Sequence, residues 1–307
     1  MEIRLLAFES LGVRSQATFI QTRDATIIID PSAALAPRRY GLAPHRREVE
    51  RLIYLFDVIS DFLRESEVIV VTHYHYDHHD PARFIDPELY RGKRLLIKDP
   101  KNNINVSQRV RAHRFLSIVK DRVRSIEVAD SATIVIGRTK ITVSTPVPHG
   151  EDSKLGYVIE LCIDDGDTRV LYTSDVEGAP LQQQIDFALK CRPHIAIMDG
   201  VPTYLIGRGY SYESLKSALN SLMKLLEVSE LECIVYDHHA ARELNYMETI
   251  ASAIERARAL GKRIVSAAEF MGLEPLFLEA MRKKLYMEEP VSGIEMLKSR
   301  RLSLSYE

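Results

Sequence analysis

Hydrophobic residues in the first third of the chain alternate with polar ones or form short β-branched runs, a pattern typical of strands. Such runs occupy residues 2–10, 17–22, 25–30 and 67–71. The short polar break at residues 23–24 predicts a hairpin between two of them. Between the third and fourth runs, apolar residues recur every three or four positions and predict an amphipathic helix: Val49, Leu52, Ile53, Phe56, Ile59 and Leu63.

The remaining chain predicts hairpins first and strand-helix units afterwards. Two hairpins are expected from the runs at 132–137 and 140–147 and from those at 155–163 and 168–174. Short apolar strands then follow at 194–199, 232–237 and 262–267. Between them we expect a helix with Ser211 as N-cap and an apolar stripe from Leu215 to Leu226, and a second helix over 247–260 that stops at Gly261. A last helix is expected within 276–287.

Strand pairs mixed with strand-helix units predict a layered α/β (α+β) fold, with helices on the outer faces of the sheets. The hydrophobic content of 46% suits a sizeable core. No linker, repeat or low-complexity tract divides the sequence. We therefore expect a single domain over 1–307, in which residues 275–307 form a C-terminal extension that packs on the domain or on a partner.

Charge and cysteine content bear on the partners and the cellular location of the protein. A formal charge of −2 gives no net basic field toward nucleic acid or anionic membrane. No apolar run approaches a membrane span, and the charged N-terminus does not resemble a signal peptide. Three distant cysteines, Cys162, Cys191 and Cys233, predict buried reduced thiols. These features favour a cytoplasmic location without membrane association.

The stretch VIVVTHYHYDHHD, residues 68–80, carries the strongest chemical signal. It places His73, His75, Asp77 and His78 directly behind a strand, and imidazole and carboxylate are ligands that zinc and neighbouring divalent metals accept. Alternatively, Asp80 and Pro81 begin a helix and the histidines merely lie on its approach loop. That alternative leaves the histidines unexplained, and a helix at Pro81 is also compatible with a metal site.

Isolated histidines and aspartates end other predicted strands: Asp30, His149, Asp175 and His238. In this order, with the central motif, the residues resemble the signature of the metallo-β-lactamase fold superfamily of metal-dependent hydrolases. The resemblance covers about residues 1–270 and implies a four-layer αββα sandwich with a metal site at one edge of the sheets. The stretches LGVRSQATF and VYDHHAAR resemble an archaeal branch of that superfamily whose substrates are unassigned.

Carried over residue by residue, the resemblance implies two metal ions. One would be held by His73, His75 and His149, and the other by Asp77, His78 and His238. Asp175 would bridge the two, and Asp30 would orient a ligand from behind. His239 is an alternative to His238, because the two are adjacent and Asp237 stands where relatives often carry a small hydroxyl residue.

Two divalent ions a few ångströms apart can hold a bridging hydroxide, with Asp77 as the catalytic group that takes or relays its proton. The expected reaction is hydrolysis of a small ester, lactone, thioester or phosphodiester. Zinc is the default metal, and iron or manganese also suits these ligands. Tyr204 and Arg208, on a loop between predicted ligands, are candidate contacts to a small-molecule substrate, which includes phosphorylated ones.

Other functions stay open. A nuclease or nucleic-acid-processing factor would use the basic stretches at 109–124 and 37–52. Solvated helix faces with buried apolar residues are the more frequent explanation of such stretches. A noncatalytic, metal-stabilised binding protein is a further alternative. Diiron redox relatives carry glutamate where this chain has His75, which disfavours redox chemistry. The sequence leaves the oligomeric state undetermined.

Overall fold

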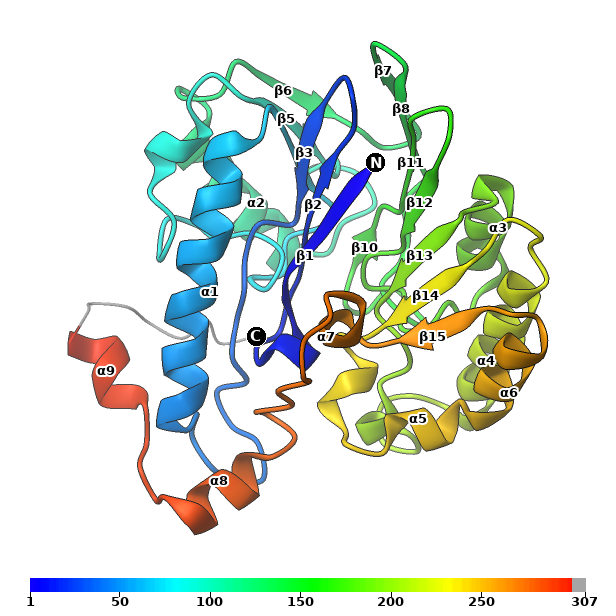
Figure 1. The fold of residues 1–307 in the computed structure, drawn as a ribbon. Helices are drawn as coiled ribbons and strands as arrows, with labels where there is room; N and C mark the ends of the chain where they lie inside the picture. Colours follow the sequence, from blue (N-terminus) through cyan, green and yellow to red (C-terminus); the bar gives the residue numbers. More distant parts are fainter. Residues whose placement is uncertain (300–307) are drawn as a thin grey trace.

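The structure is a computed structural model that describes residues 1–299. Two sheets face each other and helices cover both outer sides (Figure 1). The first sheet contains, in spatial order, β1 (Glu2–Phe8), β2 (Gln16–Gln21), β3 (Thr26–Ile29), β4 (Val68–Val71), β5 (Arg94–Ile97) and β6 (Ser125–Val128). The second contains β15 (Arg263–Val265), β14 (Cys233–Tyr236), β13 (Ile195–Met198), β12 (Arg169–Tyr172), β11 (Leu161–Asp164), β8 (Thr139–Val143) and β7 (Thr133–Ile136). The short strands β9 (Val147–Pro148) and β10 (Tyr157–Val158) pair separately.

Each sheet has an antiparallel part and a parallel part. The hairpins β2–β3, β7–β8 and β11–β12 are antiparallel, which confirms the sequence prediction. Strands β3 to β6 run parallel to one another, and so do β12 to β15. Parallel strands bring their carboxyl ends to one edge of a sheet, where open α/β sheets bind ligands. The loops after β3, β4, β12 and β14 therefore belong to such edges.

Helices α1 (Arg46–Glu65) and α2 (Val106–Val119) lie on the side of the first sheet, and α3 (Gln182–Cys191), α4 (Tyr212–Leu226) and α6 (Ala251–Ala259) on the side of the second (Figure 1). The shorter helices are α5 (Tyr246–Thr249), α7 (Ala267–Phe270), α8 (Arg282–Glu288) and α9 (Ile294–Ser299). Ser211 caps α4 by accepting a hydrogen bond from the Ser214 N–H, as predicted. The helix expected over 247–260 is instead split into α5 and α6.

The strand period of two divides each buried strand between two cores. Along β12, Val170 and Tyr172 face the core between the sheets, whereas Leu171 packs in the second core beneath α3, α4 and α6. Strand β13 does the same with Ile197 on one side and Met198 on the other. Burial on both faces explains why these strands are almost continuously apolar.

Two expected helices differ from the structure. No helix begins at Pro81; instead, one carboxylate oxygen of Asp80 accepts hydrogen bonds from the N–H groups of residues 83, 84 and 85 and closes a loop. Pro87 also disfavours helical geometry at the residue before it. The helix expected within 276–287 is limited to α8, whose Arg282 pairs with Glu48 of α1, so the described part of the C-terminal extension packs on its own chain.

The expectation of three reduced thiols is wrong. Cys162 of β11 and Cys191 at the end of α3 form a disulfide, and Cys233 is free and buried. The two bonded residues are 29 positions apart, and only the packing of α3 on the second sheet brings their Cα atoms to 5.8 Å. Among the residues that the structure describes, no helix is long and apolar enough to cross a membrane.

Candidate metal centre

Five strand ends carry the residues that the sequence singled out. They follow β3, β4, β9, β12 and β14 in chain order: Asp30, then His73, His75, Asp77 and His78, then His149, Asp175 and His238. All are buried except His75, which is partly exposed. Segments more than 200 residues apart in the chain thus meet at one edge.

His73, His75, His149 and Asp175 form one group, in which each residue offers a ligand atom and all of these atoms lie within 4.8 Å of one another. The Nε2 atoms of His149 and His73 lie 3.2 and 3.5 Å from Oδ2 of Asp175. Three imidazoles and a carboxylate at this spacing are a donor set that fits zinc, iron or manganese.

Asp77, His78 and His238 form a second group within the same limit. The Nε2 atom of His238 lies 3.6 Å from Oδ2 of Asp77 and 3.6 Å from Oδ1 of Asp175. The Nε2 atom of His78 lies 3.1 Å from Oδ2 of Asp175. Asp175 therefore lies between the two groups and faces both.

Asp30 supports this arrangement from behind. Its carboxylate accepts hydrogen bonds from the backbone N–H and the hydroxyl of Thr72, at 2.7 and 2.6 Å, and from the Tyr172 hydroxyl at 2.8 Å. It also lies 2.8 Å from Nδ1 of His78. A carboxylate on Nδ1 fixes the ring orientation and leaves Nε2 toward the second group.

Backbone strain accompanies three of these strand ends. Asp30, Ser174 and His238 have φ values of 48°, 55° and 48°, in the left-handed region that side chains disfavour. Asp237 holds the His238 turn by accepting hydrogen bonds from the N–H groups of Ser10, His238 and Ala267, at 3.1, 2.7 and 2.8 Å. Asp237, which stands where relatives often carry a small hydroxyl residue, therefore holds the loop that carries the predicted ligand His238.

His238 and His239 occupy different surroundings. His239 places Nδ1 2.9 Å from Oδ2 of Asp199, and its Nε2 lies 3.7 Å from Asp175. It groups with Asp175 and His238, whereas His238 also groups with Asp77 and His78. His238 is thus the one that faces the ligands of the second group.

The protonation states differ among the proposed ligands. Burial lowers the pKa of His73 to about 4 and lowers that of His75 well below its ordinary value, so both imidazoles are neutral near pH 7. Burial opposes ionisation of Asp77 and Asp175, but the positive groups around them, His78 and His238 among them, together outweigh it and hold the pKa of both carboxyls below the usual range. Burial opposes protonation of His78, His149 and His238, but the carboxylates around them outweigh it and raise the pKa of all three, that of His238 to about 9. Because metals bind the neutral imidazole, metal binding would release protons from these three rings.

Buried polar atoms without hydrogen-bond partners gather around these two groups. Among the described residues, those on predicted ligands and within the two groups are His73 Nε2, Asp77 Oδ1, His78 Nε2 and Asp175 Oδ1. His149 Nδ1 and His238 Nδ1 are also unpaired there, but they lie toward Glu177 and Glu9. Native proteins leave few such atoms, because each one costs about 1–3 kcal/mol. A cluster of open imidazole and carboxylate atoms therefore fits divalent cations.

A cavity of about 470 Å³ opens onto this centre. Its lining includes His75, Asp77, His149, Asp175, Tyr204 and four basic residues, Arg14, Arg111, Lys154 and Arg242. The sequence indicated Tyr204 but gave no signal for the buried Arg242 or for Glu177, whose pKa burial raises to about 7. Arg208 is exposed and is not part of this lining.

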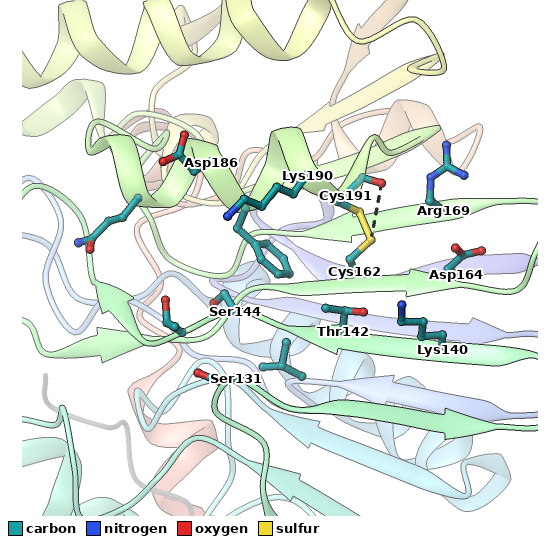
Figure 2. Close-up of a pocket in the computed structure, with 14 residues that line it drawn as sticks. Ser131, Lys140, Thr142, Ser144, Cys162, Asp164, Arg169, Asp186, Lys190 and Cys191 are labelled. Carbon is teal, nitrogen blue, oxygen red and sulfur yellow. Dashed lines mark hydrogen bonds between the residues drawn. A yellow bond between two sulfur atoms is a disulfide. The ribbon is translucent and has the colours of Figure 1, made fainter.

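A larger cavity, of about 600 Å³, lies elsewhere, between α3 and strands β8 and β11. Figure 2 shows the Cys162–Cys191 disulfide in its wall, with Lys140 and Lys190 nearby. None of the metal-site candidates lines it. Volume alone would therefore identify the wrong place for the chemistry.

No protein-family model matches the chain. It is 47% identical over 290 residues to the UPF0282 protein of Saccharolobus solfataricus, and the alignment covers 94% of each chain. The UPF0282 protein of Sulfurisphaera tokodaii has the same identity and coverage. The sequence resemblance to an archaeal branch is thus confirmed.

Solved structures share the fold at low identity. A possible metal-dependent hydrolase from Veillonella parvula has a TM-score of 0.51 and 14% identity, and the match covers 86% of this chain and 94% of that one. The metallo-β-lactamase fold protein YhfI from Bacillus subtilis has a TM-score of 0.52 and 13% identity, with 85% and 93% covered. These matches confirm the expected metallo-β-lactamase fold.

Proposed function

The chain belongs to the UPF0282 family, and from that premise we propose that it is a dinuclear metal-dependent hydrolase. Its substrate would be a small molecule with an ester, lactone, thioester or phosphodiester bond. The observation that carries the proposal is the convergence of two ligand groups on Asp175, with open imidazole and carboxylate atoms in both. The fold agrees, because the similar Veillonella parvula protein is described as a possible metal-dependent hydrolase.

In this proposal His73, His75 and His149 hold one ion, Asp77, His78 and His238 hold the other, and Asp175 contacts both. Bound divalent ions would supply Lewis acidity and lower the pKa of water. Asp77 lies at the pocket and is ionised, so its carboxylate can orient the attacking water and relay its proton. Asp30 keeps His78 in the required tautomer. Zinc is our default, and iron or manganese suits the same donors.

A nucleic-acid substrate is a second candidate, favoured by the rim of the pocket. Arg111 lines the pocket, and the guanidinium carbons of Arg83 and Arg111 lie 4.2 and 4.7 Å from the centre of the Tyr76 ring. Arginines and an aromatic ring are groups that bind phosphates and stacked bases. This candidate requires binding to RNA or DNA that weakens steeply with salt, and no binding at low salt would exclude it.

We also propose a cytoplasmic location. It rests on the charge and hydropathy pattern of the sequence, whereas the disulfide counts against it, because disulfides are rare in most cytosolic proteins. Fractionation of cells followed by immunoblotting would test the location, and recovery outside the cytoplasm would contradict it.

The first test is metal content per chain, measured by elemental mass spectrometry on the wild type and on His73→Ala, His238→Ala and His239→Ala. His113→Ala is the matched control, because His113 is exposed on α2. We expect about two ions in the wild type and the control, and a loss in the first two variants. A loss in His239→Ala but not in His238→Ala would reassign the last ligand. A metal-free wild type after reconstitution would overturn the proposal.

Hydrolysis is tested separately, with the metal-loaded wild type and a panel that covers the four bond types. Turnover that disappears in Asp77→Asn while the metal content persists would support the proposed role of Asp77. A full metal complement without turnover on any panel member would favour the noncatalytic binding protein instead.

A further inference from the structure

Arg242 is a buried cation beside the candidate metal centre. It lies at the end of the short 3-10 turn Ala240–Arg242 that follows His238, and only 4% of its surface is exposed. It lines the cavity that opens onto both ligand groups. Its Nη2 atom lies 3.7 Å from Oδ2 of Asp77 and 3.3 Å from Nε2 of His238.

The guanidinium of Arg242 is incompletely paired. Nη1 donates a hydrogen bond to the Tyr204 hydroxyl at 2.9 Å, but Nε has no hydrogen-bond acceptor among the described residues. The carboxylate oxygen closest to Nε, on Glu9, is 3.5 Å away. An unpaired N–H on a buried charge is costly, so a stable guanidinium here needs a further acceptor.

The proposed metal binding would remove a second hydrogen-bond acceptor from Arg242. The Nε2 atom of His238 accepts from Nη2, and it is also the atom that faces Asp77 and Asp175. Once that nitrogen binds a metal, it no longer accepts from Arg242. Nη2 would then be available to an acceptor at the metal centre. Nε, which lies 3.5 Å from Glu9, shares an edge of the planar guanidinium with Nη2, and such an edge can bind phosphate with two parallel hydrogen bonds.

We propose that Arg242 binds a non-bridging oxygen of a phosphoryl group, and that the substrates are phosphate esters or phosphodiesters. This inference rests on the proposed function and selects one of its four bond types. A phosphoryl group presents several charged oxygens, so it can face the ions and Arg242 together. A neutral lactone or ester offers a single carbonyl oxygen and no ground-state charge for the guanidinium.

The residues around Arg242 fit this role. Tyr204 fixes Nη1 and therefore positions the guanidinium, and the Arg39 guanidinium stacks 4.7 Å from the centre of the Tyr204 ring. Arg111 and Lys154 line the outer part of the same cavity, where the rest of an anionic substrate would lie. The alternative role for Arg242 is that of a counter-ion to Glu9 and Asp77, with no contact to substrate.

The test measures binding of inorganic phosphate to the metal-loaded full-length protein by titration calorimetry, with metal content determined on the same samples. We expect Arg242→Gln to weaken phosphate binding about 10- to 100-fold with an unchanged metal content. Arg242→Lys should restore part of it, and acetate should bind far more weakly than phosphate. Arg258→Gln, an equal charge change at an exposed position of α6, should bind as the wild type does.

Phosphate binding by Arg242→Gln within twofold of the wild type, with both ions retained, would overturn the inference while leaving the hydrolase proposal intact. Equal binding of acetate and phosphate would also overturn it. A wild type without metal would fail the proposed function itself. If Arg242→Gln loses its metal, Tyr204→Phe decides, because it removes only the bond that holds Nη1: we expect a several-fold loss of phosphate affinity, and no loss would contradict the role.

Discussion

Two buried arginines of this chain show opposite degrees of pairing. Arg282, fully buried where α8 meets α1, donates to both carboxylate oxygens of Glu48 at 2.8 Å and to the carbonyls of Ala36 and Leu42 at 3.0 Å. Arg242, almost equally buried, has one hydroxyl, one ring nitrogen and an unpaired Nε. Every nitrogen of the Arg282 guanidinium is therefore hydrogen-bonded within the chain, whereas that of Arg242 keeps an N–H group without an acceptor among the described residues.

The contrast extends to the surroundings of the two arginines. Around Arg282, the interface between the C-terminal segment and α1 is completed by the chain itself, so its polar groups need nothing more. Around Arg242, the unpaired atoms lie on histidines and carboxylates that converge on Asp175. Pairing that is complete indicates a structural role, and pairing that is incomplete in one place indicates a ligand.

The largest expected effect comes from breaking the complete pair. Arg282→Met leaves the buried Glu48 without its partner and should lower the free energy of unfolding by about 3–5 kcal/mol, measured by urea denaturation. Metal content should not change. The double variant Glu48→Gln/Arg282→Met should recover most of the loss, because no buried charge remains. If Arg282→Met were as stable as the wild type, the hydrogen bonds of Arg282 would not stabilise the interface between α8 and α1.

The second-largest effect, counted per ion, is expected when a chelator removes metal from the candidate site around Asp175. A chelator should lower the unfolding free energy of the metal-loaded protein by about 3 kcal/mol for each ion removed if free metal is near 100-fold above its dissociation constant. The physical reason is that buried carboxylates and imidazoles lose the cations that compensate them. The double variant His73→Ala/His238→Ala should show no shift on chelation. An equal shift in that variant would place the metal elsewhere.

A smaller effect is expected for Asp30, whose hydrogen bonds are all made within the chain but which contacts a proposed metal ligand. Asp30 is fully hydrogen-bonded, yet its last partner is the proposed ligand His78. Asp30→Asn should weaken metal affinity about 10- to 100-fold, because the tautomer and orientation of His78 are no longer fixed. Competition with a metal-binding dye measures this, and Asp24→Asn, at a distant turn, is the control. Unchanged affinity would mean that Asp30 serves only the fold.

Local patterns were enough to predict the strand-end residues. The β-branched runs before Asp30, His73, Asp175 and His238 fix where each strand stops, and parallel strands must bring those ends to one edge. The candidate positions therefore follow from chain position and residue type, whereas their division between two metals was implied by the resemblance to the metallo-β-lactamase fold superfamily. The hairpins, the N-cap at Ser211 and the amphipathic helix α1 follow from equally local signals.

What the sequence did not reveal depends on packing between distant segments. Arg242 looks like any polar residue after a strand, and only the fold buries it beside Asp77. The disulfide joins two cysteines whose apolar neighbours indicated separate buried thiols. The Pro81 helix failed because the Asp80 carboxylate caps three loop N–H groups instead of starting a helix. Each depends on a contact that no local pattern encodes.

The smallest expected effect tests whether an unpaired buried group always indicates a ligand. Glu160 is fully buried outside the two metal groups, and neither carboxylate oxygen has a partner in the described part of the chain. Burial raises its pKa well above the ordinary value, and the nearby Asp199 raises it further. The unfolded chain therefore ionises Glu160 at a lower pH than the native protein does.

Because the native state then holds the extra proton, stability is lost as the pH rises above about 4.5. Glu160→Gln removes this dependence, so thermal unfolding should show a gain over the wild type of about 1 kcal/mol at pH 8 and almost none at pH 4. Such a gain would show that Glu160 is merely a costly group, and that convergence of several unpaired atoms, rather than a single one, distinguishes the Arg242 region. Equal stability of the two proteins at both pH values would instead mean that Glu160 has a partner of its own.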